Sequence, residues 1–131
     1  MSISAYRRTM AQTESPRQIE RRLLSEATNL LRTHIAFDML QDPESILSML
    51  ANGLRDAIWR NQQIWQALKV DLMSSENSLP PALRGSLISL ALWVDRHSFA
   101  VLEGKQKIKP LIDVNLSIIR SLNGDTGQET R

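Results

Sequence analysis

The side chains that most often carry catalysis near neutral pH are scarce in this 131-residue chain. It contains no cysteine and two histidines, His34 and His97, which excludes thiolate nucleophiles and cysteine-based metal or iron–sulfur sites. His97 follows Asp95 and Arg96, but residues one or two positions apart point to different sides of a helix. The pattern therefore favours surface or half-buried histidines over a catalytic base or a metal ligand.

Glycines and carboxylates do not form a catalytic pattern either. The five glycines are scattered along the chain, without a phosphate-binding loop or the Gly-x-Ser-x-Gly turn of serine hydrolases. Asp38 and Asp42 are one helical turn apart, and Asp42 with Glu44 resembles a carboxylate pair, but roles at a helix start explain them as well. We expect no enzyme, no cofactor and no metal site.

Arginines in the first third of the chain raise the question of nucleic-acid binding. They are Arg7, Arg8, Arg17, Arg21 and Arg22. Three interleaved glutamates halve this charge, the net charge is only +2, and Tyr6 is the one aromatic residue nearby that a base could stack on. A solvated helix face is the favoured interpretation.

The first residues contain no apolar stretch typical of a secretory signal, and no run of about 18 uncharged apolar residues occurs anywhere. We expect a cytoplasmic protein without membrane insertion.

Apolar residues recur at three- and four-residue steps in four segments, which predicts four amphipathic helices. The segments begin at Pro16, Pro43, about Pro81 and Pro110, and they end near Leu40, Leu72, Glu103 and Leu122. Ser15 and Asp42 are suited to cap the first two helices, each with a proline after it. Gly53 interrupts the second, where we expect a continuous helix although a bend is an alternative. Gly104 should end the third helix in a left-handed conformation.

No period-two pattern with turn dipeptides predicts a sheet. We therefore expect an all-α, single-domain antiparallel bundle of about four helices over residues 1–122. Residues 1–14 are expected to form a loosely ordered arm, and residues 123–131 a disordered tail.

The three tryptophans lie on helices that are already apolar. Trp59 and Trp65 are six residues apart, so at least one of them lies away from the main stripe of its helix. Trp93 lies off the stripe of the third helix. Each either completes the core from a second side or forms an exposed anchor for a partner.

Several short segments, taken in order, resemble one known family. They are Ala5-Tyr6-Arg7-Arg8, residues 14–20 (ESPRQIE), Trp65 ahead of Asp71-Leu72, then Asn77, Leu79-Pro80, Leu83-Arg84, residues 87–97 (LISLALWVDRH) and residues 111–115 (LIDVN). Over residues 5 to about 120 the chain resembles the flagellar biosynthesis regulator FlaF family. Residues 33–53 carry least of the resemblance.

The resemblance implies a non-enzymatic regulator of flagellum assembly. It would bind flagellin as an export chaperone and promote flagellin synthesis and secretion; alternatively, it would regulate flagellin translation through RNA or a partner such as a FlbT-like regulator. A homodimer that covers the surplus apolar surface is a third interpretation.

Flagellin's terminal segments are amphipathic and fold only on packing, so a helical bundle with surplus apolar surface is suited to bind them. We predict a groove near Trp65, Leu72, Leu79 and Trp93, with Asp71 and Arg84 as charges at its rim. The predicted partner-binding residues are thus Tyr6, Trp65, Asp71, Leu72, Leu79, Arg84 and Trp93.

Overall fold

The computed structural model describes residues 15–128, of which Pro16, Arg17 and residues 122–128 are described by their backbone alone. The four long helices are α2 (Pro16–Arg32), α4 (Arg55–Met73), α5 (Pro81–Leu102) and α6 (Lys109–Gln128). Three shorter elements are the 3₁₀ helix η1 (Ile35–Met39), the helix α3 (Pro43–Met49) and the π-helical segment η2 (Leu50–Leu54). Residues 15–128 contain no strand, which confirms the all-α prediction.

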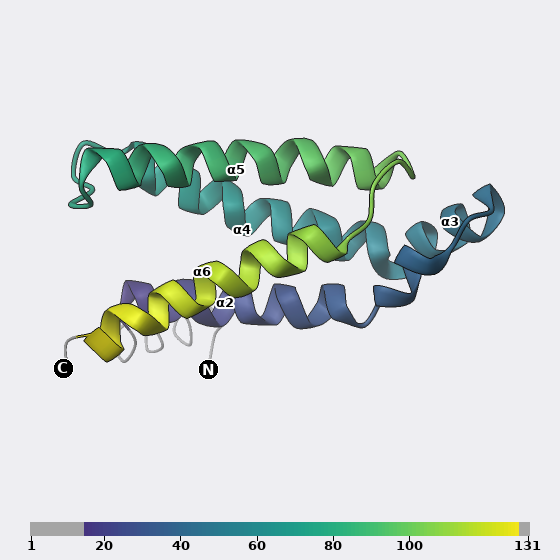
Figure 1. The fold of residues 1–131 in the computed structure, drawn as a ribbon, viewed down its shortest axis with the longest axis horizontal. Coiled ribbons are helices and arrows are strands. Elements are labelled where there is room, and N and C mark those ends of the chain that lie inside the picture. The colour runs from purple at the N-terminus through teal and green to yellow at the C-terminus, as the bar shows by residue number, and fades with distance from the viewer. Residues whose placement is uncertain (1–14, 129–131) are drawn as a thin grey trace, which may run out of the picture.

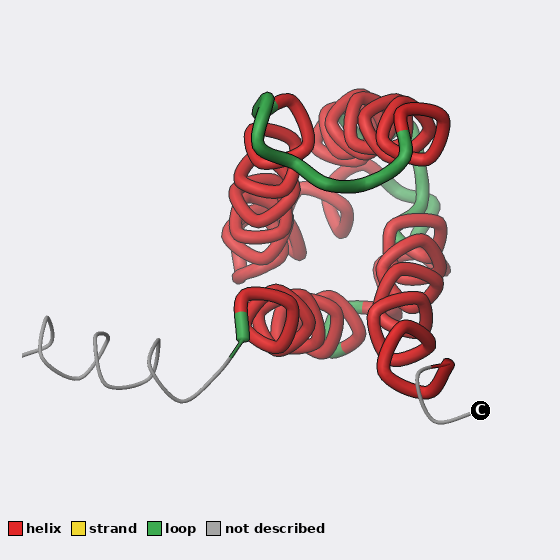
Figure 2. Tube along the Cα trace, turned by 90° about the vertical axis from the view of Figure 1, so that its left-hand side faces the viewer, coloured by secondary structure: helices red, strands yellow, loops and turns green. Residues whose placement is uncertain are grey.

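The four long helices run alternately in opposite directions, as the colours of Figure 1 show. Viewed from the end they occupy the corners of a square (Figure 2), in the order α2, α4, α5, α6 around it. Contacts are most extensive between α4 and α5 and between α2 and its two neighbours, and sparsest between α5 and α6. The predicted antiparallel helical bundle is confirmed.

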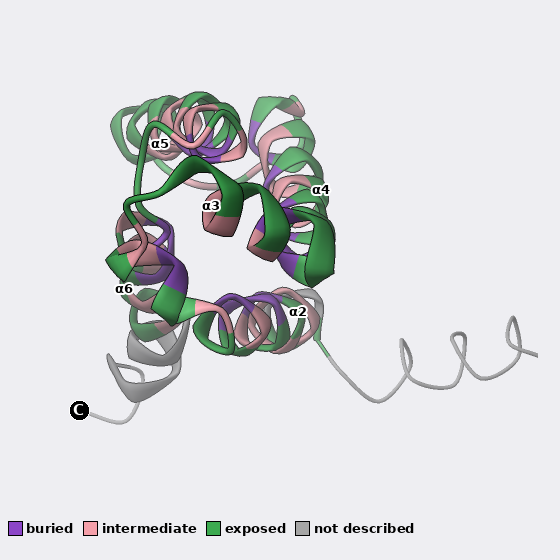
Figure 3. Cartoon of the chain, turned by 90° about the vertical axis from the view of Figure 1, so that its right-hand side faces the viewer, coloured by how far each residue is buried: buried purple, intermediate pink, exposed green. Residues whose placement is uncertain are grey.

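The core lies where the inner stripes of the four helices meet. Its fully buried side chains include Leu24 and Leu31 of α2, Leu54 and Ile58 beside the start of α4, Val94 and Val101 of α5, and Leu111 of α6. The outer sides of the helices are largely exposed (Figure 3).

Two helix starts follow the caps expected from the sequence. The Ser15 hydroxyl accepts a hydrogen bond from the backbone N–H of Gln18, and the Gln18 side chain accepts one from the backbone N–H of Ser15. The Asp42 carboxylate accepts a bond from the backbone N–H of Ser45 at 3.0 Å. These bonds satisfy N–H groups that have no partner within the helix.

The prediction that the first helix reaches Leu40 is wrong, because α2 ends at Arg32. The Thr33 hydroxyl donates to the carbonyl oxygen of Leu30 at 2.6 Å, a local bond that competes with continuation of the helix. The chain then forms η1, which brings the Asp38 carboxylate to the N–H groups of Ile108 and Lys109 at 2.7 and 2.9 Å. Asp38 therefore caps α6 from a distant part of the sequence.

The prediction of a continuous second helix is also wrong. Asn52 and Gly53 have non-helical backbone angles, and Gly53 has a φ of 114°, a conformation that glycine adopts without steric cost. A Cβ at Gly53 would lie 3.1 Å from Nε2 of His34. The bend at Gly53 separates α3 from α4, so that α3 lies across one end of the bundle (Figures 1 and 3).

The third helix agrees with its prediction, since α5 begins at Pro81 and ends at Leu102. Gly104 has a φ of 75°, which confirms the left-handed cap. The last helix does not stop at Leu122 but continues to Gln128. Its final residues include no proline, and a glycine within a helix costs only about 1 kcal/mol relative to alanine. The predicted arm, residues 1–14, and residues 129–131 of the predicted tail lie outside the described residues.

Candidate partner-binding site

Trp65 belongs to a buried chain of hydrogen bonds that joins α4 to α6. Its indole Nε1 donates to Oδ1 of Asn115 at 2.8 Å, and Nδ2 of Asn115 donates to Oδ1 of Asn61 at 2.7 Å. All three residues are buried, Trp65 with 3% of its surface exposed. Because the indole N–H can only donate, it fixes the orientation of both amides and leaves Nδ2 of Asn61 without a partner among residues 15–128. Trp65 thus holds two helices together.

Asp71, Leu79 and Arg84 shape the connection between α4 and α5. Nδ2 of Asn77 donates to the backbone oxygen of Asp71 at 3.3 Å and to its carboxylate at 3.4 Å. Oδ1 of Asn77 accepts from the backbone N–H of Leu79, and its backbone oxygen accepts from the guanidinium of Arg84. Leu72, just before this connection, is buried. The predicted rim charges therefore organise a helix connection around Asn77.

Trp93 is half-buried in the second half of α5, the half that precedes the connection to α6. Its ring stacks on the imidazole of His97, with 4.8 Å between the ring centres. Nε2 of His97 donates to the backbone oxygen of Lys107 at 2.8 Å, since a carbonyl only accepts. The pair fixes the turn between α5 and α6.

These positions correct the groove predicted from the sequence. Trp65 and Leu72 are buried, and Trp93 is half-buried against the core and stacked on His97, so the structure does not assemble them with Leu79 into one exposed surface. Tyr6 lies outside the described residues. A partner-binding role for these residues stays a prediction, and each described one has a contact or a buried position that supports the fold.

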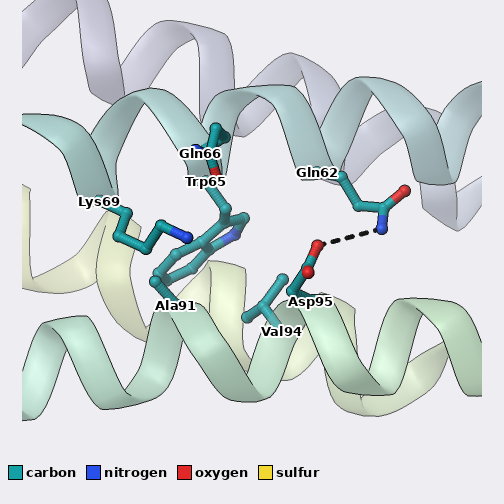
Figure 4. Close-up of a pocket in the computed structure, with 7 residues that line it drawn as sticks. All are labelled: Gln62, Trp65, Gln66, Lys69, Ala91, Val94 and Asp95. Carbon is teal, nitrogen blue, oxygen red and sulfur yellow. Dashed lines mark hydrogen bonds between the residues drawn. The ribbon is translucent and has the colours of Figure 1, made fainter.

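A shallow groove does lie nearby, between the outer sides of α4 and α5 (Figure 4). It has about 10 Å³ open to water, room for about one water molecule. It is lined by Gln62, Trp65, Gln66, Lys69, Ala91, Val94 and Asp95. Nε2 of Gln62 donates to Oδ1 of Asp95 at 3.2 Å across it. Trp65 contributes to its floor while its indole N–H points into the core. Of the predicted site residues that the structure describes, only Trp65 lines this groove.

Trp59, on the same helix as Trp65, has 56% of its surface exposed. It precedes the groove-lining residues Gln62 and Gln66 by three and seven positions, which places all three on the same helix face. The sequence indicated that Trp59 or Trp65 lies off the main stripe but did not indicate which. The structure decides it, because Trp65 shares the buried face of Ile58 and Asn61 whereas Trp59 does not.

Within residues 15–128, no cluster of three or more histidine, aspartate or glutamate side chains is arranged to hold a metal ion. Asp38 lies four residues after His34, but its carboxylate caps α6 while Nδ1 of His34 lies 3.2 Å from the carbonyl oxygen of Leu30. No helix in this part of the chain is both long and apolar enough to cross a membrane.

Comparison with known proteins identified one family. A family model described as flagellar protein FlaF matches residues 2–122, which is nearly the whole chain. Searches among curated proteins and among solved structures gave no match. The matched range contains the Trp65–Asn115 pair, the Asn77-centred connection and the Trp93–His97 stack. The chain therefore belongs to the FlaF family of flagellar proteins.

Proposed function

We propose that this protein binds flagellin in the cytoplasm as an export chaperone, and thereby promotes the synthesis and secretion of flagellin without acting as an enzyme. Its membership of a flagellar family supports a role in flagellum assembly. The single observation that carries the binding role is the exposure of Trp59, a side chain that the bundle does not use for its own core.

An exposed tryptophan in a small protein is a strong candidate for an anchor at an interface, where tryptophan contributes more binding energy than most residues. Flagellin segments that fold only on assembly carry apolar stripes that need to be covered beforehand. A bundle whose core is complete without Trp59 is suited to cover such a stripe while remaining folded.

The direct test is size-exclusion chromatography of the full chain mixed with its monomeric flagellin. The proposal predicts one peak that contains both proteins and elutes before either of them alone. Separate elution over a range of concentrations, checked by calorimetry, would contradict a chaperone role.

A second candidate is regulation of flagellin translation, either on RNA or through a regulatory protein such as a FlbT-like partner. It is favoured by the arginines of α2, among which Arg32 is exposed. Replacing Arg17, Arg21 and Arg22 with glutamine should then lower flagellin synthesis. If synthesis is unchanged in that variant while export fails, the translational candidate loses its support.

A further inference from the structure

Several exposed apolar side chains lie along both sides of the groove between α4 and α5. On α4, Trp59 and Val70 share a face with the groove-lining residue Gln66, at spacings of seven and four residues. On α5, Leu92 and Phe99 share a face with the groove-lining residue Asp95, at spacings of three and four. We call these four residues and the groove between them the α4–α5 outer face.

Four large apolar side chains on one face of a small protein are seldom all exposed to this extent. Exposed fractions are 56% for Trp59, 60% for Val70, 44% for Leu92 and 54% for Phe99. Met73 continues the row on α4 with 67% exposed, and Ile88 continues it on α5, half-buried. Since the core is already closed on the opposite sides of these helices, the face forms a second seam, in which two apolar rows flank the polar side chains of Gln62, Gln66, Lys69 and Asp95.

The dimensions of this seam fit one helix. Trp59 and Val70 are eleven residues apart, as are Ile88 and Phe99, which corresponds to about 16 Å of helix at about 1.5 Å per residue. An amphipathic helix of about three turns spans this length. Its apolar stripe would lie between the two rows, above the small side chain of Ala91 in the groove.

Two charged groups in the groove could set the direction in which a partner helix binds. Lys69 and Asp95 both line it (Figure 4), and neither forms an ion pair among the described residues, Asp95 being bonded to the amide of Gln62. Because Gln62 bonds to Asp95, the two residues lie at the same height along the groove. Lys69 follows Gln62 by seven residues, so the two charges are about 10 Å apart along α4. A partner helix with an acidic and a basic side chain about two turns apart would match both charges in one orientation only.

We propose that the α4–α5 outer face binds a single amphipathic helix of flagellin, with an acidic side chain of that helix beside Lys69 and a basic or amide side chain beside Asp95. This rests on the proposed function in taking flagellin as the protein that carries the helix. The binding mode is a helix laid in a groove, in which apolar anchors supply affinity and the two charges fix direction.

A second copy of this chain fits the same face less well. The apolar side chains stand on both sides of a groove, so two such faces brought together would place groove against groove and leave the floor around Ala91 uncovered. One helix instead lies over the groove and contacts both rows at once.

The test measures flagellin binding to the full chain by calorimetry. Trp59→Ser and Phe99→Ser should each weaken binding at least tenfold, because each removes a large anchor from one side of the groove. Leu47→Ser is the matched control: Leu47 is 61% exposed but lies on α3, away from this face, and its loss should change affinity less than twofold. Thermal unfolding by circular dichroism checks that every variant is folded.

The charges are tested separately. Lys69→Glu should weaken binding at least fivefold, whereas Lys107→Glu, an exposed lysine in the connection before α6, should leave it unchanged.

The outcomes distinguish this inference from the proposed function. A complex that tolerates Trp59→Ser, Phe99→Ser and Lys69→Glu would overturn the α4–α5 outer face as the docking site and leave the chaperone role intact. No complex with the unaltered chain would overturn both. A dimer of this chain that Trp59→Ser converts to a monomer would show a second copy on the face, and would also overturn the inference.

Discussion

Asn61 and Asn115 show how a few polar residues decide which helices meet in the core. Both amides are buried, and their orientations follow from one donor, the indole N–H of Trp65. Asn115 bonds to two partners, whereas Asn61 has one bond and an unpaired Nδ2. A buried polar group without a partner costs about 1–3 kcal/mol, so the two residues should contribute very differently to stability.

We predict that Asn115→Ala lowers the free energy of unfolding by about 2–4 kcal/mol, because it leaves both Trp65 and Asn61 without their partner. Asn61→Ala should cost less, about 1–2 kcal/mol, since it leaves Nδ2 of Asn115 without its acceptor but also removes the unpaired Nδ2 of Asn61. Urea unfolding of the two variants beside the unaltered chain measures both values. Equal losses, or a larger loss for Asn61→Ala, would show that the amides are oriented differently.

Asp42 gives a pH-dependent contribution at the start of α3. Hydrogen bonds from Ser45, the backbone N–H first, lower the pKa of this carboxyl group from its ordinary value of 3.8. Because the folded-state pKa is the lower one, the stabilisation is fully present above about pH 3.8 and is lost as the pH falls through the folded-state value.

Carbon-detected NMR titration should therefore place the midpoint of Asp42 below 3.8. In Asp42→Asn, stability should fall less steeply on acidification than in the unaltered chain, when unfolding is followed from about pH 5 to pH 2. A midpoint at or above the ordinary value would argue against the cap.

At the scale of elements, the breaks between helices matter as much as the helices. Gly53 allows the turn that separates α3 from α4, and η1 brings Asp38 to the start of α6. The bend at Gly53 and the segment between α2 and η1 are in contact, because the backbone at Gly53 lies against the ring of His34. The end of the bundle covered by α3 therefore depends on residues that interrupt helices.

We predict that Gly53→Ala destabilises the fold by about 1–3 kcal/mol, because alanine is strained at a φ of 114° and its Cβ would crowd the His34 ring. Gly85→Ala is the matched control within α5, where an added Cβ meets no atom within 4 Å. It should stabilise the protein by about 0.5–1 kcal/mol through helix propensity. Thermal or urea unfolding distinguishes the two signs, and a neutral Gly53→Ala would contradict the assigned bend.

The sequence was sufficient to predict the starts of α2, α3 and α5. It was insufficient to predict the end of α2, the break at Gly53 before α4 and the end of α6. Ser15 and Asp42 act within one turn of themselves, so local chemistry identifies their helix starts. The place of η1 after α2 depends on Asp38 meeting residues some 70 positions later, which no local pattern contains. Burial of Trp65 and exposure of Trp59 depend likewise on which stripe faces α6.

At the scale of the whole molecule, the segments that resemble the FlaF family largely hold the bundle together. Trp65 with Asn115, Asn77 with Asp71 and Arg84, and Trp93 with His97 all join elements of this chain. This explains why residues picked out by family resemblance did not coincide with an exposed surface. The surface that we propose for a partner is the α4–α5 outer face, whose apolar side chains the helices of residues 15–128 leave exposed.

Hydrogen–deuterium exchange of the full chain, alone and with excess monomeric flagellin, tests this account most directly. If flagellin docks on the α4–α5 outer face, exchange should slow on binding in residues 59–73 of α4 and 88–99 of α5, with little change in α2. The reason is that a docked helix shields the outer face and suppresses local opening. Slower exchange confined to other helices, or no change while flagellin is bound, would contradict it.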